Sequence, residues 1–543
     1  MKTKELSFSQ KARQKMKDGI DQLTKSVACT LGPNGNIVLI EQQFSPSSTL
    51  AATKDGVSVA KAIKLEDKFE NIGAELVREA ASKTNDVAGD GTSTSVILAQ
   101  SMITEGMKLV ATGISPVEIK QSINAKVKDV VKELKKLSQT VSDDPEKIKQ
   151  VAKISSNNDE EIGNVISETI QEVGRDGIIT IEQSQSFGIE KEITSGMQFN
   201  KGYMSPYLVT DKVKMEAVIE NPYVLIIDRK LNNFNEILPL LEKVHNSPKK
   251  ELLIIAEEIE GEAFQNIVIN KIKGALNIIG CKAPEFGNNQ KDTLADIATL
   301  TGATIISQEI GIKLENVELD MLGNAKKVIS NKDKTIIIGG AGKQEEVDKR
   351  IEQVKISLDK AESRFEKEKL NRRLGNLAGG IGVIKVGGVT ETEMKERRDR
   401  VEDSLAATKA AIEEGIIAGG GISLINASGA MKQLIDEGGN YTVGEKIVNN
   451  AILEAVRQIA LNSGKDGSVI LFNIDKEQNK QKNKNVGYNA VTDTYEDMIK
   501  AGVIDPTKVA RTALQNAASV ACTFLSTECI IAVKEDGKQE VNQ

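Results

Sequence analysis

The sequence contains no tryptophan, one histidine, four cysteines and only 3% aromatic residues. With a single histidine, His245, and no CxxC pair, a zinc site is not expected. Four scattered cysteines in a long acidic chain indicate reduced thiols in a reducing compartment. The low aromatic share predicts aliphatic, alanine-rich cores.

The sequence also lacks a long apolar run and an excess of positive charge. No stretch approaches the roughly 18 uninterrupted apolar residues of a membrane-spanning helix, and the N-terminal residues contain no apolar segment of signal-peptide length. A formal net charge of −7 argues against nucleic acid or an acidic membrane as the main partner. We therefore expect a globular protein that binds neither nucleic acid nor membrane. It would be cytoplasmic, or would lie in an equivalent lumen after processing.

Three regions with different patterns follow one another along the 543 residues. Residues 1–136 and those beyond 390 have apolar residues at helical spacing. Between about 195 and 381, short apolar runs alternate with helical segments, which is typical of an α/β domain with a largely parallel sheet. These runs are 223–228, 251–256 and 275–280. One long, charged helix is expected over about 344–374.

An α/β module inserted into a helical domain needs two crossing points. Ser195-Gly196 and Gly379-Gly380 are the candidates, because glycine absorbs large backbone changes. Ordinary turns at these positions are the alternative.

One glycine-flanked carboxylate suggests a ligand site. Asp90 lies between Gly89 and Gly91, and four hydroxyl residues follow before an apolar run. A helix N-terminus there would offer free N–H groups and the positive end of a dipole to phosphate. A carboxylate would repel phosphate unless a cation lies between them, so Asp90 is interpreted as a Mg²⁺ ligand. In the alternative interpretation Asp90 only caps the helix.

Other candidates are weaker from spacing alone. The glycine-rich stretch 336–345 fails the P-loop pattern, because Lys343 is followed by glutamine. A second glycine loop is expected from residues 30–36 and 53–58. Asp403 lies off the apolar stripe of its helix, and a solvated face is the default for such a residue.

Seven short motifs occur in the order found in group I chaperonins, and the chain resembles the GroEL-type subunit from end to end apart from its tail. The motifs are Thr30-Leu31-Gly32-Pro33, Lys54-Asp55-Gly56, Gly89-Asp90-Gly91-Thr92, Arg400-Val401-Glu402-Asp403, Ala418-Gly419-Gly420-Gly421, Tyr488-Asn489-Ala490 and Asp505-Pro506-Thr507-Lys508. The resemblance implies a multidomain α and α/β fold. Its parts would be a helical equatorial domain (1–136 and 414–543), an intermediate hinge domain (137–194 and 382–413) and an inserted α/β apical domain (195–381).

The resemblance also implies a function and a site. The chain would be an ATP-dependent chaperone that captures non-native polypeptides and encloses them for folding, with ATP and Mg²⁺ as cofactors and K⁺ as a candidate second cation. The implied nucleotide residues are Thr30, Leu31, Gly32, Pro33, Lys54, Asp90, Gly91, Thr92, Ser93, Thr94, Gly420, Asn489, Ala490 and Asp505. Asp90 would hold the metal, Asp403 would position or activate the attacking water, and Asp55 would assist near the γ-phosphate.

Two apical segments, 234–244 and 262–272, have apolar residues on more than one face. Such a helix is usually fully buried. The resemblance instead assigns the spare face to a groove for non-native chains and for a GroES-type co-chaperonin. The groove residues would be Tyr203, Tyr207, Leu208, Leu238, Leu241, Phe264, Val268 and Ile269.

The resemblance implies a homo-oligomer of seven-membered rings, with a double ring favoured over a single one. Lys465 and Asp466 stand where the family commonly has an acidic pair between rings, which makes the double ring less secure. Asn34 and Asn36 replace usual basic residues, and Ser93 replaces a usual threonine. Two rival classes are a scaffold that binds chains without turnover and a conventional α/β ATPase or kinase. The retained aspartates argue against the first, and the failed P-loop argues against the second.

Overall fold

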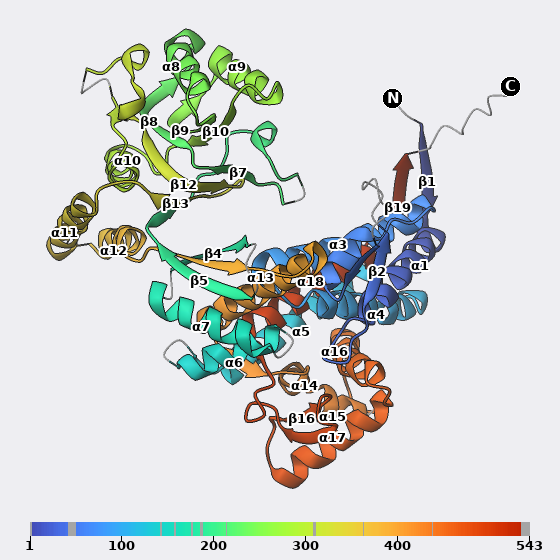
Figure 1. Cartoon of the computed structure of the whole chain (residues 1–543). Helices are drawn as coiled ribbons and strands as arrows, with labels where there is room; N and C mark the ends of the chain where they lie inside the picture. Colours follow the sequence, from blue (N-terminus) through green and yellow to red (C-terminus); the bar gives the residue numbers. More distant parts are fainter. Residues whose placement is uncertain are drawn as a thin grey trace. The chain divides into compact units, whose positions relative to one another are not determined.

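The computed structural model describes residues 3–41, 50–141, 144–156, 159–174, 177–184, 188–212, 214–307, 311–361, 363–436 and 438–533 (Figure 1). Backbone contacts divide the chain into two compact units. The first comprises Met1–Ser167, Gln183–Ile189 and Val386–Gln543, and the second comprises Glu168–Glu182 and Glu190–Lys385. The division into three domains stays a prediction.

The first unit is mainly helical. Its helices are α1 (Ser9–Ala28), α2 (Gly56–Ala62), α3 (Lys68–Ala88), α4 (Thr92–Ala111), α5 (Pro116–Leu137), α6 (Pro145–Ser155), most of α7 (Glu160–Val173), α13 (Glu391–Glu414), α14 (Ile422–Ser428), α15 (Ala430–Ile435), α16 (Val443–Asn462), α17 (Gly467–Gln481) and α18 (Thr507–Leu525). Its strands form antiparallel pairs: β1 (Lys4–Phe8) with β19 (Cys529–Val533), β2 (Val38–Glu41) with β3 (Leu50–Thr53), β15 (Ile416–Ala418) with β18 (Ile504–Pro506), and β16 (Val486–Asn489) with β17 (Thr494–Asp497).

The core of this unit lies among α1, α3, α4, α5, α16 and α18, and Figure 1 shows α3, α4 and α18 side by side. It is aliphatic and rich in alanine, as the low aromatic content predicts. Small residues let the helices approach closely. A Cβ on Gly73 of α3 would lie 2.1 Å from the carbonyl oxygen of Met16 on α1. None of the helices described, in either unit, is both long and apolar enough to cross a bilayer.

The second unit is α/β. Its strands are β4 (Ile178–Gln183), β5 (Ile189–Thr194), β6 (Gly196–Phe199), β7 (Ala217–Glu220), β8 (Tyr223–Leu231), β9 (Glu251–Ile259), β10 (Asn277–Lys282), β11 (Ile305–Ile306), β12 (Gly323–Ser330), β13 (Thr335–Gly340) and β14 (Ile381–Val386). Its helices are α8 (Phe234–Asn246), α9 (Gly261–Ile272), α10 (Asn288–Thr301), α11 (Gln344–Lys360) and α12 (Arg364–Ala378), with short 3₁₀ turns η1 (Pro206–Leu208), η2 (Leu314–Asn316) and η3 (Leu319–Met321). Both glycine-bearing crossing candidates lie in or beside this unit's strands, and their hinge role stays a prediction.

The main sheet has the order β10-β9-β8-β12-β13-β6, with β11 beside β8 and β7 beside β12. The three predicted strands are present as β8, β9 and β10, and these pair in parallel because α8 and α9 connect them. The prediction of a largely parallel sheet is wrong, since β12, β13, β6 and β7 pair antiparallel. For the pair β12 and β13 the reason is local. Asn331 makes a tight turn between β12 and β13, with its side chain accepting from the amides of Asp333 and Lys334.

The single long helix expected over 344–374 is two helices, α11 and α12. Ser363 starts the second one, where its hydroxyl accepts from the amide of Glu366 at 3.1 Å. Ala361, between the helices, is buried against Leu370 and Leu377. Ser363 and Glu366 form the Ser-x-x-Glu pattern of a helix start. The helical spacing over 344–374 alone did not indicate this break.

The close approach of α1 and α3 predicts a stability effect. Gly73→Ala should lower the free energy of unfolding by about 1–3 kcal/mol, because the new methyl group forces the two helices apart. A Cβ on Gly375 of α12 would meet no neighbouring atom within 4 Å, so Gly375→Ala should be neutral or stabilising by up to about 1 kcal/mol. Thermal unfolding followed by circular dichroism measures both, and equal midpoints for the two variants would contradict this packing.

Candidate functional site

The turn between α3 and α4 has the conformation that the glycines predict. Gly89 ends α3 with φ +70°, and Gly91 precedes α4 with φ +80°, so both occupy the left-handed region that favours glycine. No side chain caps α4. The carboxylate of Asp90 accepts instead from the amide of Gly91 at 2.5 Å. The interpretation of Asp90 as a helix cap is therefore wrong, and the amides of Thr92 to Thr94 start the helix without a capping side chain.

Helix α13 packs on this turn. A Cβ on Gly89 would lie 2.0 Å from the Cβ of Ala406, and Ala410 packs against Ala88. Asp403 precedes Ala406 by three residues, so it lies on the same side of the helix. Burial, followed by repulsion from Asp55 and Asp90, raises the pKa of Asp403 well above its usual range. Asp403 is thus close to both aspartates and is not a solvated surface residue.

A second loop reaches the same helix start. Asp55 caps α2, accepting from the amides of Val57 at 3.1 Å and Ser58 at 2.9 Å. The next residue, Gly56, is so close to α4 that a Cβ there would lie 2.2 Å from the hydroxyl oxygen of Ser93. The side chain of Lys54 is exposed beside this loop.

The stretch 30–33 follows α1 and also meets α4. The hydroxyl of Thr30 lies 3.2 Å from that of Ser93. Asn462 on α16 donates to the carbonyl oxygen of Leu31 at 2.8 Å, and Gly32 has φ +84°. After Pro33, the side chain of Asn34 donates to the carbonyl oxygen of Ala490 at 2.9 Å. Asn34, a departure from the family pattern, therefore connects two of the predicted nucleotide segments, which sequence reasoning did not foresee.

The C-terminal candidates lie in or just after β15, in β18, and at the end of β16. Asp505 pairs with Ile417 across the strands, and a Cβ on Gly419 would lie 3.1 Å from its carboxylate. Gly420 follows with φ +64°. Asn489 is buried and donates to Glu496 at 2.9 Å. Burial raises the pKa of Asp505 to about 7, with repulsion from Asp90 adding to it.

The site as a whole is a set of carboxyl groups that repel one another around an uncapped helix start. Burial is the main cause of the raised pKa of Asp90, and repulsion from Asp55 adds to it, although water still reaches the Asp90 side chain. Sequence reasoning missed Asp399, one helical turn before Asp403, whose repulsion contributes to the same cluster. The signal was its i, i+4 spacing from Asp403. No three carboxylate, histidine or cysteine side chains in the described ranges form a ready set of metal ligands.

The predicted apical groove is only partly exposed. Tyr207 is 71% exposed and Ile269 is 46% exposed. The side chains of Leu238, Phe264 and Val268 are half-buried.

Three groove residues are buried, namely Tyr203, Leu208 and Leu241, so their prediction as binding surface is wrong for this structure. Tyr203 forms a β-bridge with Cys281, and the two leucines pack in the core beneath α8 and α9. Ile272 belongs to the predicted apolar segment 262–272 but not to the predicted groove residues, and it is 69% exposed at the end of α9. Its i, i+3 spacing from Ile269 was the available signal.

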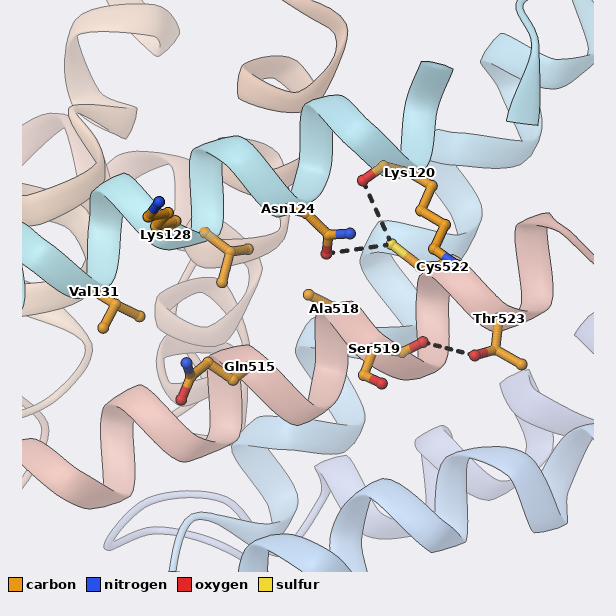
Figure 2. Close-up of a pocket in the computed structure, with 10 residues that line it drawn as sticks. Lys120, Asn124, Lys128, Val131, Gln515, Ala518, Ser519, Cys522 and Thr523 are labelled. Carbon is orange, nitrogen blue, oxygen red and sulfur yellow. Dashed lines mark hydrogen bonds between the residues drawn. The ribbon is translucent and has the colours of Figure 1, made fainter. Parts of the chain in front are cut away.

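A cavity of about 380 Å³ lies elsewhere in the first unit, between α5 and α18 (Figure 2). Figure 2 shows Lys120 and Asn124 on α5 close to Cys522 on α18. None of the residues predicted for the nucleotide lines it. Burial raises the pKa of the Cys522 thiol to about 11, so the thiol stays protonated.

Comparisons with known proteins agree with this architecture. The family model described as the TCP-1/cpn60 chaperonin family matches residues 23–535. Among solved structures, the chain is similar to the chaperonin gp146 from the bacteriophage EL 2 (Pseudomonas aeruginosa), crystallised in the presence of ATP-BeFx. The identity is 23% and the TM-score 0.66, over 98% of this chain and 99% of that chain. This likeness confirms the predicted multidomain α and α/β, GroEL-like fold. Because the family model spans nearly the whole sequence, the chain belongs to the TCP-1/cpn60 chaperonin family.

Proposed function

We propose that this chaperonin is an ATPase that uses Mg-ATP binding and hydrolysis to capture non-native polypeptides and enclose them for folding. The observation that carries the proposal is the uncapped start of α4, with Asp90 held between two left-handed glycines and Asp403 close by. The related phage chaperonin was crystallised in the presence of ATP-BeFx, which supports a nucleotide site in this fold.

The residues present fit a magnesium nucleotide. Asp90 would hold Mg²⁺, which when bound would neutralise charge on the phosphate oxygens. Because the described side chains form no ready metal cage, phosphate oxygens and water would complete the coordination. The same cation would offset the burial and the repulsion from Asp55 that raise the pKa of Asp90. K⁺ stays a prediction.

The chain's own groups would bind and orient the nucleotide. The amides and hydroxyls of Thr92, Ser93 and Thr94 would donate to phosphate oxygens, because no side chain caps α4, and Lys54 would lie near them. Gly91 would also donate to the phosphates, and Thr30, Leu31, Gly32 and Pro33 would line the nucleotide. The residues that would enclose the sugar and base are Gly420, Asn489, Ala490 and Asp505.

Asp403 would orient the attacking water and accept its proton, with Asp55 assisting. A raised pKa makes a carboxylate a stronger base, and Asp403 owes its raised pKa to burial and to the neighbouring carboxylates. This separates the proposal from a scaffold that binds chains without turnover, because such a scaffold has no use for a buried base.

The exposed apical residues support the proposed partners. Tyr207, Ile269 and Ile272 would contact non-native polypeptides, and a GroES-type co-chaperonin would use the same surface. Burying one such side chain is worth about 1.5–3 kcal/mol, so several subunits acting together would be needed.

We propose seven-membered rings, with a double ring favoured. Lys465 pairs with Asp493 of its own chain at 2.7 Å. All four cysteines are free, which fits a reducing cytoplasm.

The first test concerns turnover. Asp403→Ala should lower the rate of ATP hydrolysis by about 10²-fold or more while leaving ATP affinity within about threefold, because only the water-activating group is removed. Phosphate release and equilibrium nucleotide binding measure the two quantities. Glu396→Ala, an exposed change on the same helix, is the control and should behave as wild type. Normal hydrolysis by Asp403→Ala would remove this residue from the mechanism.

The second test concerns pH. Asp505 has a folded pKa of about 7 against an ordinary 3.8, so the folded chain holds this proton more tightly than the unfolded chain. Its stabilising contribution is complete below pH 3.8 and is lost as the pH rises through about 7. The nucleotide-free protein should therefore lose up to about 1.4 kcal/mol per pH unit from this group over that window.

Asp505→Asn should flatten that slope, and Asp129→Asn, an exposed change on α5, should not. Denaturant unfolding in magnesium-free buffer at several pH values gives the slopes. An unchanged slope in Asp505→Asn would show that Asp505 is not desolvated.

The third test concerns client capture. Ile269→Ser on α9 should weaken the binding of a chemically unfolded protein several-fold, because each subunit loses part of its apolar surface. Ile356→Ser on α11 is a matched control, since Ile356 is 47% exposed and Ile269 is 46% exposed. Suppression of client aggregation and ATPase rate are measured together. Equal capture by the two variants would place the binding surface elsewhere.

A further inference from the structure

A lysine is partly buried at the end of α9, where its amine bonds to backbone. The Nζ of Lys271 donates to the carbonyl oxygen of Leu208 at 2.6 Å and lies 3.4 Å from that of Ile278 on β10. Phe264, Val268 and Lys271 are spaced i, i+4 and i+7, so they share one face of α9. On this face of α9, two apolar side chains are thus followed by Lys271, whose amine is hydrogen-bonded to the η1 turn.

The η1 turn carries the most exposed of the predicted binding residues. Its start is held to β10, since the amide of Met204 donates to the carbonyl oxygen of Gly280 at 2.8 Å. The hydroxyl of Ser205 accepts from the amide of Tyr207 at 3.3 Å. Leu208 is buried as the turn's anchor, while the Tyr207 ring beside it is 71% exposed. Lys271 holds the other end of the turn, directly after Tyr207.

Packing alone does not account for a lysine at this position. Burial lowers the pKa of Lys271 to about 8, so placing the ammonium here costs free energy. The charged group that faces it is Glu251 on β9, which partly offsets this cost, and Glu220 at the end of β7 acts in turn on Glu251. An aliphatic side chain would fill the space without that cost, but it could not donate to the carbonyl oxygen of Leu208.

We propose that Lys271 is a positioning residue that fixes the η1 turn to α9 and thereby presents the Tyr207 ring to a bound non-native polypeptide. The inference rests on the proposed capture function. Tyr207 contacts the bound polypeptide. Lys271 acts indirectly, because its bond to the η1 turn restricts the motion of the turn and of the Tyr207 ring. A preorganised aromatic contact loses less entropy when a client binds.

The test compares three variants of the full chain. Lys271→Met should raise hydrogen exchange at the amides of Leu208 and Val209 by about tenfold or more, because the turn loses the hydrogen bond from the Nζ of Lys271 to the carbonyl oxygen of Leu208. It should also weaken capture of a chemically unfolded protein several-fold and leave the ATPase rate unchanged. Lys271→Arg keeps a donor and should restore both properties. Lys273→Met, an exposed change two residues along, is the matched control.

The pH dependence of hydrogen exchange at these two amides distinguishes a positioning lysine from a residue that only fills space. A lysine released from the turn has its ordinary pKa of 10.5 against about 8 when held, so loss of the proton favours the held form. Protection of the same two amides, corrected for intrinsic exchange, should increase between pH 7 and about 9.5 in the wild type. In Lys271→Arg it should stay flat.

The outcomes separate this inference from the proposed function. Unchanged exchange in Lys271→Met, or a flat wild-type profile, would overturn the positioning role. Faster exchange with undiminished capture would overturn the presentation of Tyr207, provided that Ile269→Ser still loses capture. If Ile269→Ser also captures normally, the proposed capture surface itself is wrong.

Discussion

The burial of several carboxyl groups beside one another at the start of α4 is the constraint on which the site depends. Asp90, Asp403 and Asp505 all have a raised pKa, and in each case burial is the leading cause and another carboxylate of the cluster adds to it. A folded chain keeps such a cluster only at a cost in stability. Binding of a cation together with a phosphate chain would offset this cost. The cation would neutralise the carboxylates, and the free N–H groups at the helix start would bind the phosphate.

The rest of the first unit can be understood as a frame for that cluster. Gly89 and Gly91 let α3 turn directly into α4, Gly56 brings the Asp55 loop against Ser93, and α13 lies on the turn through Ala406. Each contact is between small groups, so a single added methyl would separate the parts. The alanine-rich core is also packed through small groups. Small side chains allow the helix axes to approach closely, and this close packing fixes the loops between the helices.

Much of this was predictable from the sequence, for identifiable reasons. The glycines at 89 and 91 and the following hydroxyls indicated the turn and the helix start, because few other residues adopt that backbone conformation. The strands β8, β9 and β10 were predictable because each is a short apolar run between helices. What failed depended on non-local or concealed signals. The antiparallel pair β12 and β13 in the second unit's sheet depends on a tight turn at Asn331, and the break between α11 and α12 depends on one capping serine. The burial of Tyr203, Leu208 and Leu241 follows from three-dimensional packing that helical spacing does not specify.

The most direct measurement is a calorimetric titration of ATP into the nucleotide-free protein, with and without Mg²⁺, in buffers of different ionisation enthalpy. The account predicts saturable binding that requires Mg²⁺ and releases protons near pH 7, because the cation lets protonated carboxyl groups of the cluster ionise. A folded protein that binds no ATP in the presence of Mg²⁺, or that binds it with no proton release, would contradict the central claim.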